Sequence, residues 1–327
     1  MPCNENFALN YKKSHPMRSE INSCLRNIDR AYRHFICQTP LLKLPGAAFN
    51  LDCTEVWLKL EHLQNSGSFK ARGMLNRLLS NPVPASGVVI ASGGNAGIAV
   101  AAAAQLLGHR CEVFLPEVSS QAKRDRLKSL GAHVTVSGAA YADAFAACVK
   151  RQAETGALMA HAYDQPEVVI GAGTLAAELE AQGGMPDSWL VSVGGGGLIA
   201  GIASWVDNRA AVIALEPENA PTLHAARAAG QPVDVAVSGV AADSLGAKRI
   251  GNIAWEVTQR LVPNSLLVTD EAIRNAQLWL WRDMKLAVEP AAALGLAALQ
   301  TGVYKPQSGE KVCLVICGAN VDPASLN

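Results

Sequence analysis

Four consecutive glycines, Gly194, Gly195, Gly196 and Gly197, are the first feature of this sequence that could do chemistry. They separate a β-branched apolar run from a helical pattern that opens at Leu198. A tight turn needs only one or two glycines, so four indicate backbone N–H groups that converge on an anion at a helix start. The turn is not a P-loop, because no Gly-Lys-Ser/Thr follows it. We therefore expect it to bind an anionic group.

Two further turns follow predicted strands. The first has the residues Ser92, Gly93, Gly94, Asn95, Ala96 and Gly97. The second, Cys317-Gly318-Ala319-Asn320, follows the apolar run 311–316. Ligands of open α/β sheets bind beyond the carboxyl ends of the strands. The three turns are therefore expected to surround one binding site.

Lys70 stands directly after an aromatic residue, Phe69, at a turn that enters the predicted helix 71–79. A lone lysine in such a place is usually a solvated surface residue. In a low-dielectric cleft its pKa would fall, and the neutral amine could act as a nucleophile or a base. The glycine turns make the second interpretation the one to test.

A dinucleotide-binding interpretation stays open at this point. Gly195, Gly197 and Ala200 fit the pattern G-x-G-x-x-A, and Glu216 follows about 20 residues later at the end of the next predicted strand. An NAD-dependent oxidoreductase would use these residues. That alternative leaves Lys70 and the Asn95 turn unexplained.

The elements that must position these residues alternate along the chain from residue 87 onward. Strands are expected over 87–92, 111–115, 133–136, 189–193, 211–215 and 311–317. Helices are expected over 71–79, 95–107, 119–130, 141–154, 198–205, 270–283 and 290–299. This alternation predicts an α/β fold with a parallel sheet, and apolar runs without polar alternation predict strands covered on both faces.

Composition excludes several classes of protein. The chain has 327 residues, 28 Lys and Arg against 28 Asp and Glu, and 50% hydrophobic residues. Disorder is not expected, and a net charge of zero provides no basic surface for nucleic acid or an anionic membrane. Residues 1–14 are too polar for a signal peptide, and the longest apolar stretch, 98–107, is too short to span a membrane. The eight cysteines form no CxxC pair and are interpreted as reduced thiols of a cytoplasmic protein.

The sequence Ser68-Phe69-Lys70-Ala71-Arg72-Gly73 resembles the motif of the Schiff-base lysine in fold-type II pyridoxal-phosphate (PLP) enzymes, specifically the L-serine and L-threonine dehydratases. The turn at Asn95 resembles their carboxylate-binding turn, and the four glycines resemble their phosphate loop. The three motifs come in the family's order across most of the chain. Ala96 after Asn95, and Cys317 at the last strand end, are most similar to the serine dehydratase branch.

The resemblance implies a role for each of these residues. Lys70 would hold the cofactor and then act as the catalytic base at the substrate's α-carbon. Cys317 would face the pyridine nitrogen as a neutral partner, which favours β-elimination over transamination. The other cofactor contacts would be Phe69, Asn95, Gly194, Gly195, Gly196, Gly197 and Leu198. The substrate carboxylate would bind Ser92, Gly93, Gly94, Asn95 and Ala96.

The resemblance also implies the fold. We expect two interleaved three-layer αβα domains with mostly parallel sheets, of the tryptophan synthase β type. A small domain over residues 63–163 would hold the Asn95 turn. A large PLP-binding domain over residues 1–62 and 164–327 would hold the four glycines and Cys317. Family members usually form homodimers, so a homodimer is expected.

The activity implied is that of a PLP-dependent ammonia-lyase, which converts L-serine to pyruvate or L-threonine to 2-oxobutanoate and releases ammonia. Hydroxyaspartate dehydration, serine racemisation and a weakly active PLP-binding homologue stay open as alternatives. Racemases carry a second acid/base serine where this chain has Gly93. That difference argues against racemisation. Glu178 and Glu289 are interpreted as structural.

A monovalent-cation site, occupied by K⁺, is implied as well. The matching positions are Gly171, Glu216, Ala220, Thr222, Leu245 and Ala247. The ion would be structural and distant from the chemistry. Glu216 could instead cap the end of its strand or pair with a cationic group.

Overall fold

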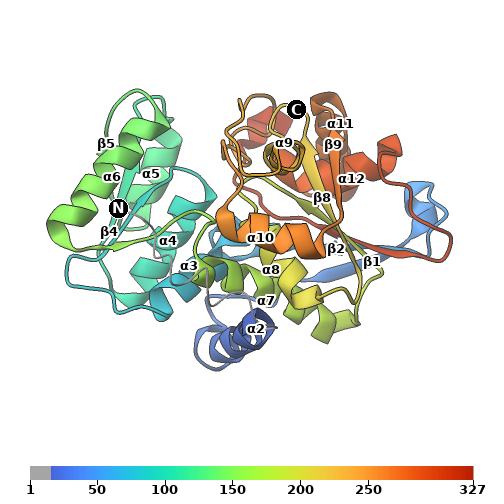
Figure 1. The fold of residues 1–327 in the computed structure, drawn as a ribbon, viewed down its shortest axis with the longest axis horizontal. Coiled ribbons are helices and arrows are strands. Elements are labelled where there is room, and N and C mark those ends of the chain that lie inside the picture. The colour runs from blue at the N-terminus through green and yellow to red at the C-terminus, as the bar shows by residue number, and fades with distance from the viewer. Residues whose placement is uncertain (1–15, 327) are drawn as a thin grey trace.

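The computed structural model describes residues 16–326. The chain forms two separate sheets, each with helices packed against it (Figure 1). The α/β fold with mostly parallel sheets is thus confirmed. The expectations about residues 1–14 and about Cys3 lie outside the described residues. Within residues 16–326, no helix combines the length and the apolar character that a membrane span requires.

The larger sheet has six strands in the order β1-β2-β10-β7-β8-β9. Its strands are β1 (Leu41–Pro45), β2 (Glu55–Lys59), β7 (Ser188–Ser192), β8 (Ala211–Pro217), β9 (Asn264–Val268) and β10 (Lys311–Val315). Only the pairing of β1 with β2 is antiparallel among the described strands. The strand latest in sequence, β10, therefore lies inside the sheet, between β2 and β7.

Helices pack on the larger sheet in two groups. One group packs around α7 and α8, and the other is α11 with α12. The helices are α2 (Pro16–Asn27), α7 (Pro166–Gly183), α8 (Gly197–Val206), α9 (Thr222–Ala229), α10 (Asn252–Leu261), α11 (Asp270–Met284) and α12 (Pro290–Thr301). Gly173 and Gly201 let α7 and α8 approach closely, since a Cβ on Gly201 would lie 2.5 Å from the Gly173 nitrogen.

The smaller sheet has four parallel strands in the order β5-β4-β3-β6. The strands are β3 (Val88–Ala91), β4 (Cys111–Leu115), β5 (His133–Val136) and β6 (Leu158–Met159). The helices around it are α4 (Asn95–Leu107), α5 (Gln121–Ser129) and α6 (Tyr141–Thr155). Side chains of β3 alternate between two cores: Val88 and Ile90 pack with α4, and Val89 and Ala91 pack with α6.

Helix α3 (Lys70–Leu79) joins the two halves, because it packs on both α4 and α7. Short helical turns complete the described chain: η1 (Ile28–Tyr32), η2 (Gly46–Phe49), η3 (Glu61–Leu63), η4 (Asn65–Gly67) and η5 (Pro323–Leu326). The domain boundaries at 62/63 and 163/164 stay a prediction. Residues before 62 also enter the core beside α4, among them Ile28 and Ile36.

Candidate active site

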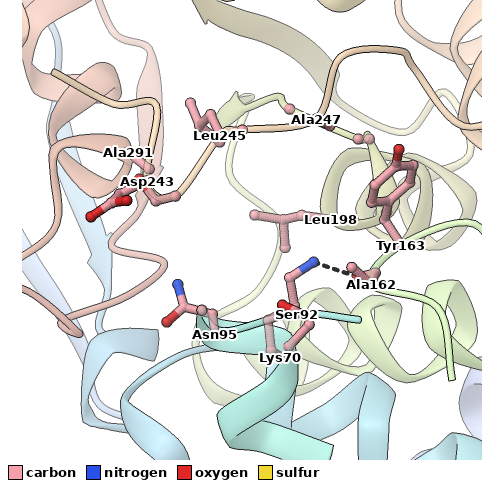
Figure 2. A pocket seen from close by; sticks show the side chains of 18 of the residues that line it. Lys70, Ser92, Asn95, Ala162, Tyr163, Leu198, Asp243, Leu245, Ala247 and Ala291 are labelled. Atoms are coloured by element: carbon pink, nitrogen blue, oxygen red, sulfur yellow. Dashed lines mark hydrogen bonds between the residues drawn. The ribbon is translucent and has the colours of Figure 1, made fainter. Parts of the chain in front are cut away.

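A cavity of about 420 Å³ lies where strand ends of the two sheets meet (Figure 2). The turn after β3, the glycines after β7 and Cys317 after β10 all line it. Lys70 and Phe69 line it as well. Every residue that the sequence predicted to bind cofactor or substrate is therefore part of one wall. Their individual roles stay proposals.

Lys70 is placed by a backbone clamp between its own loop and the end of β10. The Phe69 N–H donates to the Cys317 carbonyl at 3.1 Å, and the Ala319 N–H donates to the Gly67 carbonyl at 2.8 Å. The clamp presents Lys70 as the first residue of α3, with its amine inside the cavity. The Lys70 Nζ donates to the Ala162 carbonyl at 2.6 Å (Figure 2).

Burial lowers the pKa of Lys70 to about 8, although the neighbouring Cys317 and Glu289 act in the opposite direction. Desolvation disfavours the ammonium form and so favours the neutral amine. A substantial fraction of Lys70 is therefore neutral near physiological pH. The amine has the protonation state that a nucleophile or a base requires.

A buried ionic cluster lies beneath Lys70. Arg72 donates to both oxygens of Glu61, at 2.8 and 2.7 Å, and to Glu178 at 2.9 Å. Lys59 donates to Glu178 at 2.5 Å. All four side chains are buried. The cluster ties α3 to β2 and α7, and so anchors the helix that begins at Lys70. The structural interpretation of Glu178 fits these contacts.

The backbone of the Ser92 turn packs closely against the start of the helix that follows it. A Cβ on Gly97 would lie 1.8 Å from the Ser92 carbonyl oxygen, so only glycine fits there. The turn leads directly into α4, whose first N–H groups have no partner inside the helix. Such a helix start attracts a carboxylate.

The four glycines form a similar cradle at the start of α8. Gly196 has a φ of +87°, a left-handed conformation that favours glycine. A Cβ on Gly195 would lie 2.3 Å from ring atoms of Tyr163. The glycines therefore allow Tyr163 to cover the cradle, and N–H groups at the start of α8 remain to hold an anion.

Cys317 lies at the end of β10 with 5% of its surface exposed. Burial raises the pKa of its thiol, and the neighbouring Glu289 raises it further. The thiol therefore stays neutral, in line with the weak polar partner expected from the sequence.

Several lining residues were not predicted. Tyr163 and Ala162 follow β6, which has only two residues and shows no recognisable strand pattern. Glu289 lines the cavity too, so its structural interpretation is incomplete. Its position directly before the helix-starting Pro290 was the one available signal. The other unpredicted lining residues are Ala91, Tyr141, Ser192, Asp243, Ser244, Gly246, Lys248, Arg249 and Ala291. Leu245 and Ala247, which were expected as cation ligands away from the chemistry, line the cavity too.

Glu216 caps a helix. Its carboxylate accepts from the N–H groups of Leu223 and His224 at 2.7 and 2.9 Å, in the first turn of α9, and from Ser265 Oγ at 2.9 Å. Glu216 thus caps the helix that follows its strand, where the sequence alternative had placed the cap at the strand end itself. It does not line the cavity. These contacts lend no support to a nucleotide-binding role for this carboxylate.

The predicted cation ligands are only partly brought together. Thr222 Oγ1 donates to the Gly194 carbonyl at 2.6 Å and to Glu216 at 3.2 Å. Gly171 instead lies in α7, where a Cβ would meet the Arg72 carbonyl at 2.5 Å. Its carbonyl accepts from Thr174 Oγ1 at 2.6 Å. The cation site, Gly171 included, stays a prediction. Within residues 16–326, no three His, Cys, Asp or Glu side chains cluster as metal ligands.

Comparisons with known proteins agree with this site. Residues 32–318 match the family described as pyridoxal-phosphate dependent enzyme. An L-threonine ammonia-lyase of Geobacter sulfurreducens is 38% identical, over 83% of this chain and 69% of that protein. A phenylserine dehydratase of Ralstonia pickettii is 34% identical, over 88% and 87%. The structure of maize serine racemase superposes with a TM-score of 0.87 at 30% identity, over 94% and 95%.

The chain therefore belongs to the pyridoxal-phosphate dependent enzyme family. The cavity fits that cofactor. It contains a buried amine for the aldehyde, helix-start amides for the phosphate and a neutral thiol for the ring nitrogen. A side chain at Gly195 would collide with the Tyr163 ring beside the glycine cradle. We find no corresponding support for the NAD-dependent alternative.

Proposed function

We propose that this protein is a PLP-dependent ammonia-lyase that dehydrates and deaminates L-serine, L-threonine or both. The observation that carries the proposal is the single cavity in which Lys70, the Ser92 turn, the four glycines and Cys317 meet. Relatives named L-threonine ammonia-lyase and phenylserine dehydratase support elimination from a β-hydroxy amino acid.

Each residue has a definite task in this reaction. PLP, when bound, supplies the electron sink that stabilises negative charge at the amino acid's α-carbon. The glycine-loop amides hold its phosphate, and Cys317 faces the ring nitrogen without adding charge. Amides of the Ser92 turn hold the substrate carboxylate, and Lys70 Nζ removes the α-proton. Loss of the β-hydroxyl as water leaves an enamine, which hydrolyses to a 2-oxo acid and ammonia.

Racemisation is the second candidate, because a serine racemase has the same fold at 30% identity. It requires a proton donor on the face opposite Lys70. Gly93 has no side chain to donate a proton, and a Cβ there would lie 2.8 Å from Leu115 Cδ2. The residue at position 93 thus favours elimination over racemisation.

The test is an absorption spectrum of the purified protein, followed by a 2-oxo acid assay. The substrates are L-serine, D-serine, L-threonine, β-hydroxyaspartate and phenylserine. We expect a visible cofactor band and oxo acid from L-serine or L-threonine. Lys70→Ala should remove both the band and turnover, because Nζ is the amine proposed to bind the aldehyde and to remove the α-proton. A band without oxo acid would favour a weakly active homologue, and no band would refute the proposal.

The oligomeric state, the localisation and the bound cation are proposals that rest on the sequence and the resemblance. We propose a homodimer in the cytoplasm, to be checked by light scattering and cell fractionation. A K⁺ ion is proposed as well, at the positions that the resemblance implies: Gly171, Glu216, Ala220, Thr222, Leu245 and Ala247. Activity that is equal in K⁺ and in a large organic cation would argue against the ion.

A further inference from the structure

Asn95 is held from two sides by residues to which the proposed reaction gives no role. Its amide nitrogen, Nδ2, donates to both carboxylate oxygens of Glu289 at 2.9 Å. Its amide oxygen, Oδ1, accepts from Nδ2 of Asn320 at 2.6 Å. The three side chains come from the start of α4, the residue before α12 and the turn after β10.

These contacts select one orientation of the Asn95 amide. A rotation of 180° would turn Oδ1 toward the carboxylate of Glu289, with acceptor facing acceptor. It would also turn Nδ2 toward Nδ2 of Asn320, with donor facing donor. Both mismatches are unfavourable, so the two neighbours together distinguish the two ends of the amide.

The orientation matters because the two neighbours lie differently relative to the cavity. Glu289 is 4% exposed and lines the cavity, whereas Asn320 is exposed and does not line it. The nitrogen of Asn95 is thus on the cavity side and its oxygen is on the far side. Figure 2 shows the Asn95 side chain reaching into the cavity from the start of α4. The amide therefore presents its nitrogen, and not its acceptor oxygen, to the cavity, and the Glu289 carboxylate holds that nitrogen in place.

Glu289 and Asn320 are themselves fixed to the catalytic loop. The Asn320 N–H donates to Glu289 Oε1 at 2.8 Å, and Asn320 Nδ2 also donates to the Ser66 carbonyl at 2.8 Å. Ser66 lies four residues before Lys70. The Glu289 N–H donates to the Gly318 carbonyl at 3.0 Å. One network therefore joins the Asn95 turn, the Lys70 loop and the end of β10.

We propose that Glu289 and Asn320 are positioning residues that hold the Asn95 amide with its nitrogen toward the 3′-oxygen of PLP. This inference rests on the proposed function and on the cofactor contact of Asn95 that the resemblance implies, which we assign to that oxygen. Neither residue is given a proton-transfer role. Their effect on the cofactor acts through Asn95.

The test exchanges the polarity of the two neighbours. Glu289→Gln provides a donor where Asn95 now meets an acceptor, and Asn320→Asp provides an acceptor where it meets a donor. In the double variant a flipped Asn95 amide recovers its contacts with both neighbours, and the net charge is unchanged. Only the contact of residue 320 with the Ser66 carbonyl is lost, in the double variant as in Asn320→Asp alone. The measurements are the absorption spectrum of each holoenzyme, the rate at which PLP is lost on dialysis, and the midpoint of urea unfolding.

We expect the double variant to unfold at a urea concentration at least as high as the less stable single variant does. It should nevertheless lose PLP at least tenfold faster than the wild type, because the flipped amide presents an oxygen to the 3′-oxygen. Asn320→Ala, at an exposed position, should also accelerate the loss of PLP, although it does not exchange the polarity of either neighbour. A double variant that keeps PLP like the wild type would overturn the inference.

Asn76→Asp is the matched control. Asn76 is a buried asparagine of α3 whose Nδ2 donates to the Glu167 carbonyl at 2.8 Å, outside the cavity. It should lower the unfolding midpoint without changing PLP loss, and equally fast loss there would refute a specific positioning role. If Asn95→Ala keeps PLP, the role of Asn95 and this inference fail together. A wild type that never binds PLP instead refutes the proposed function.

Discussion

Lys70 has a nucleophilic amine in an enclosed position. Its protonation state should control the rate at which the protein takes up PLP. Only the neutral amine attacks an aldehyde. With a pKa of about 8, the uptake rate of PLP by the cofactor-free protein should rise about tenfold per pH unit below 8 and level off above it. Stopped-flow absorption measures this profile.

The control for this profile is Lys150→Ala, because Lys150 is an exposed lysine of α6 with 80% of its side-chain surface accessible. Its removal should leave the profile unchanged. An uptake rate that keeps rising to pH 10 would contradict the lowered pKa of Lys70.

Cys317 provides a second prediction at the level of one side chain. In the proposed function its neutral thiol would give the ring nitrogen no negative partner. Cys317→Asp should introduce a carboxylate that favours a protonated ring, change the absorption spectrum and lower the ratio of elimination to transamination. Product analysis with L-serine measures that ratio, and Cys317→Ser should preserve it. An unchanged ratio in the aspartate variant would count against the assigned role.

Single residues differ in how far the sequence reveals them. Lys70, Asn95 and the four glycines each stand in a short local motif. Their grouping could be predicted because two of these motifs follow predicted strands and all three resemble motifs of one family. Tyr163 and Glu289 line the same cavity without a motif, because contacts with distant segments give them their place. Asn320 was part of a recognised turn, yet its contact with Asn95 spans 225 residues and no local pattern indicates it.

At the level of elements, the glycine loop between β7 and α8 should tolerate no side chain beneath Tyr163. Gly195→Ala places a Cβ 2.3 Å from ring atoms of Tyr163, so the ring or the loop must move. We expect PLP affinity to fall at least tenfold and stability to fall by about 1–3 kcal/mol. Titration of the cofactor-free protein measures the affinity.

Gly183→Ala is the control for this variant. Its Cβ would meet only the flexible ends of Leu41 and Lys43, at the end of α7. PLP affinity should remain at the wild-type value. If both glycine variants weaken PLP binding equally, the cradle is not the reason.

The ionic cluster that anchors α3 gives a prediction about stability. Arg72→Met leaves the buried Glu61 without its ion-pair partner and the buried Glu178 with Lys59 alone. We expect a loss of about 3–5 kcal/mol in the free energy of unfolding, measured by urea titration. Arg151→Met breaks a pair whose arginine is 48% exposed and should cost about 0–1 kcal/mol. If both variants lose the same free energy of unfolding, burial of the ion pairs does not explain the effect of Arg72→Met.

Elements with a clear local signature could be predicted at their observed bounds. Helix α4 and strands β4 and β5 match their expected ranges, since apolar runs and turn residues delimit them. Helix α7 was missed, although it has 18 residues. It is buried on most sides, and two glycines interrupt its pattern because helices cross there. Strand β2 was missed because a buried, paired Lys59 makes it look solvated.

At the scale of the whole molecule, PLP should stabilise both halves at once, because the cavity wall comes from both sheets. At a free concentration about 100 times its Kd, the cofactor should add about 2.7 kcal/mol to the free energy of unfolding. Tryptophan fluorescence reports on the larger core, which contains Trp57 and Trp189. Hydrogen exchange in β4 and β5 reports on the smaller sheet. Protection gained on one side alone would contradict a shared site.

The central place of β10 has a consequence for biosynthesis. A ribosome releases β2 and β7 long before residues 311–315, which must later be inserted between them. Until then, two strand edges inside the future sheet stay open to wrong partners. The same late segment carries Cys317 and Asn320, so a nascent chain cannot build a complete cofactor pocket. Loading with PLP is thus expected only after residues 311–320 have been synthesised, and chaperones have their clearest task in the interval before it.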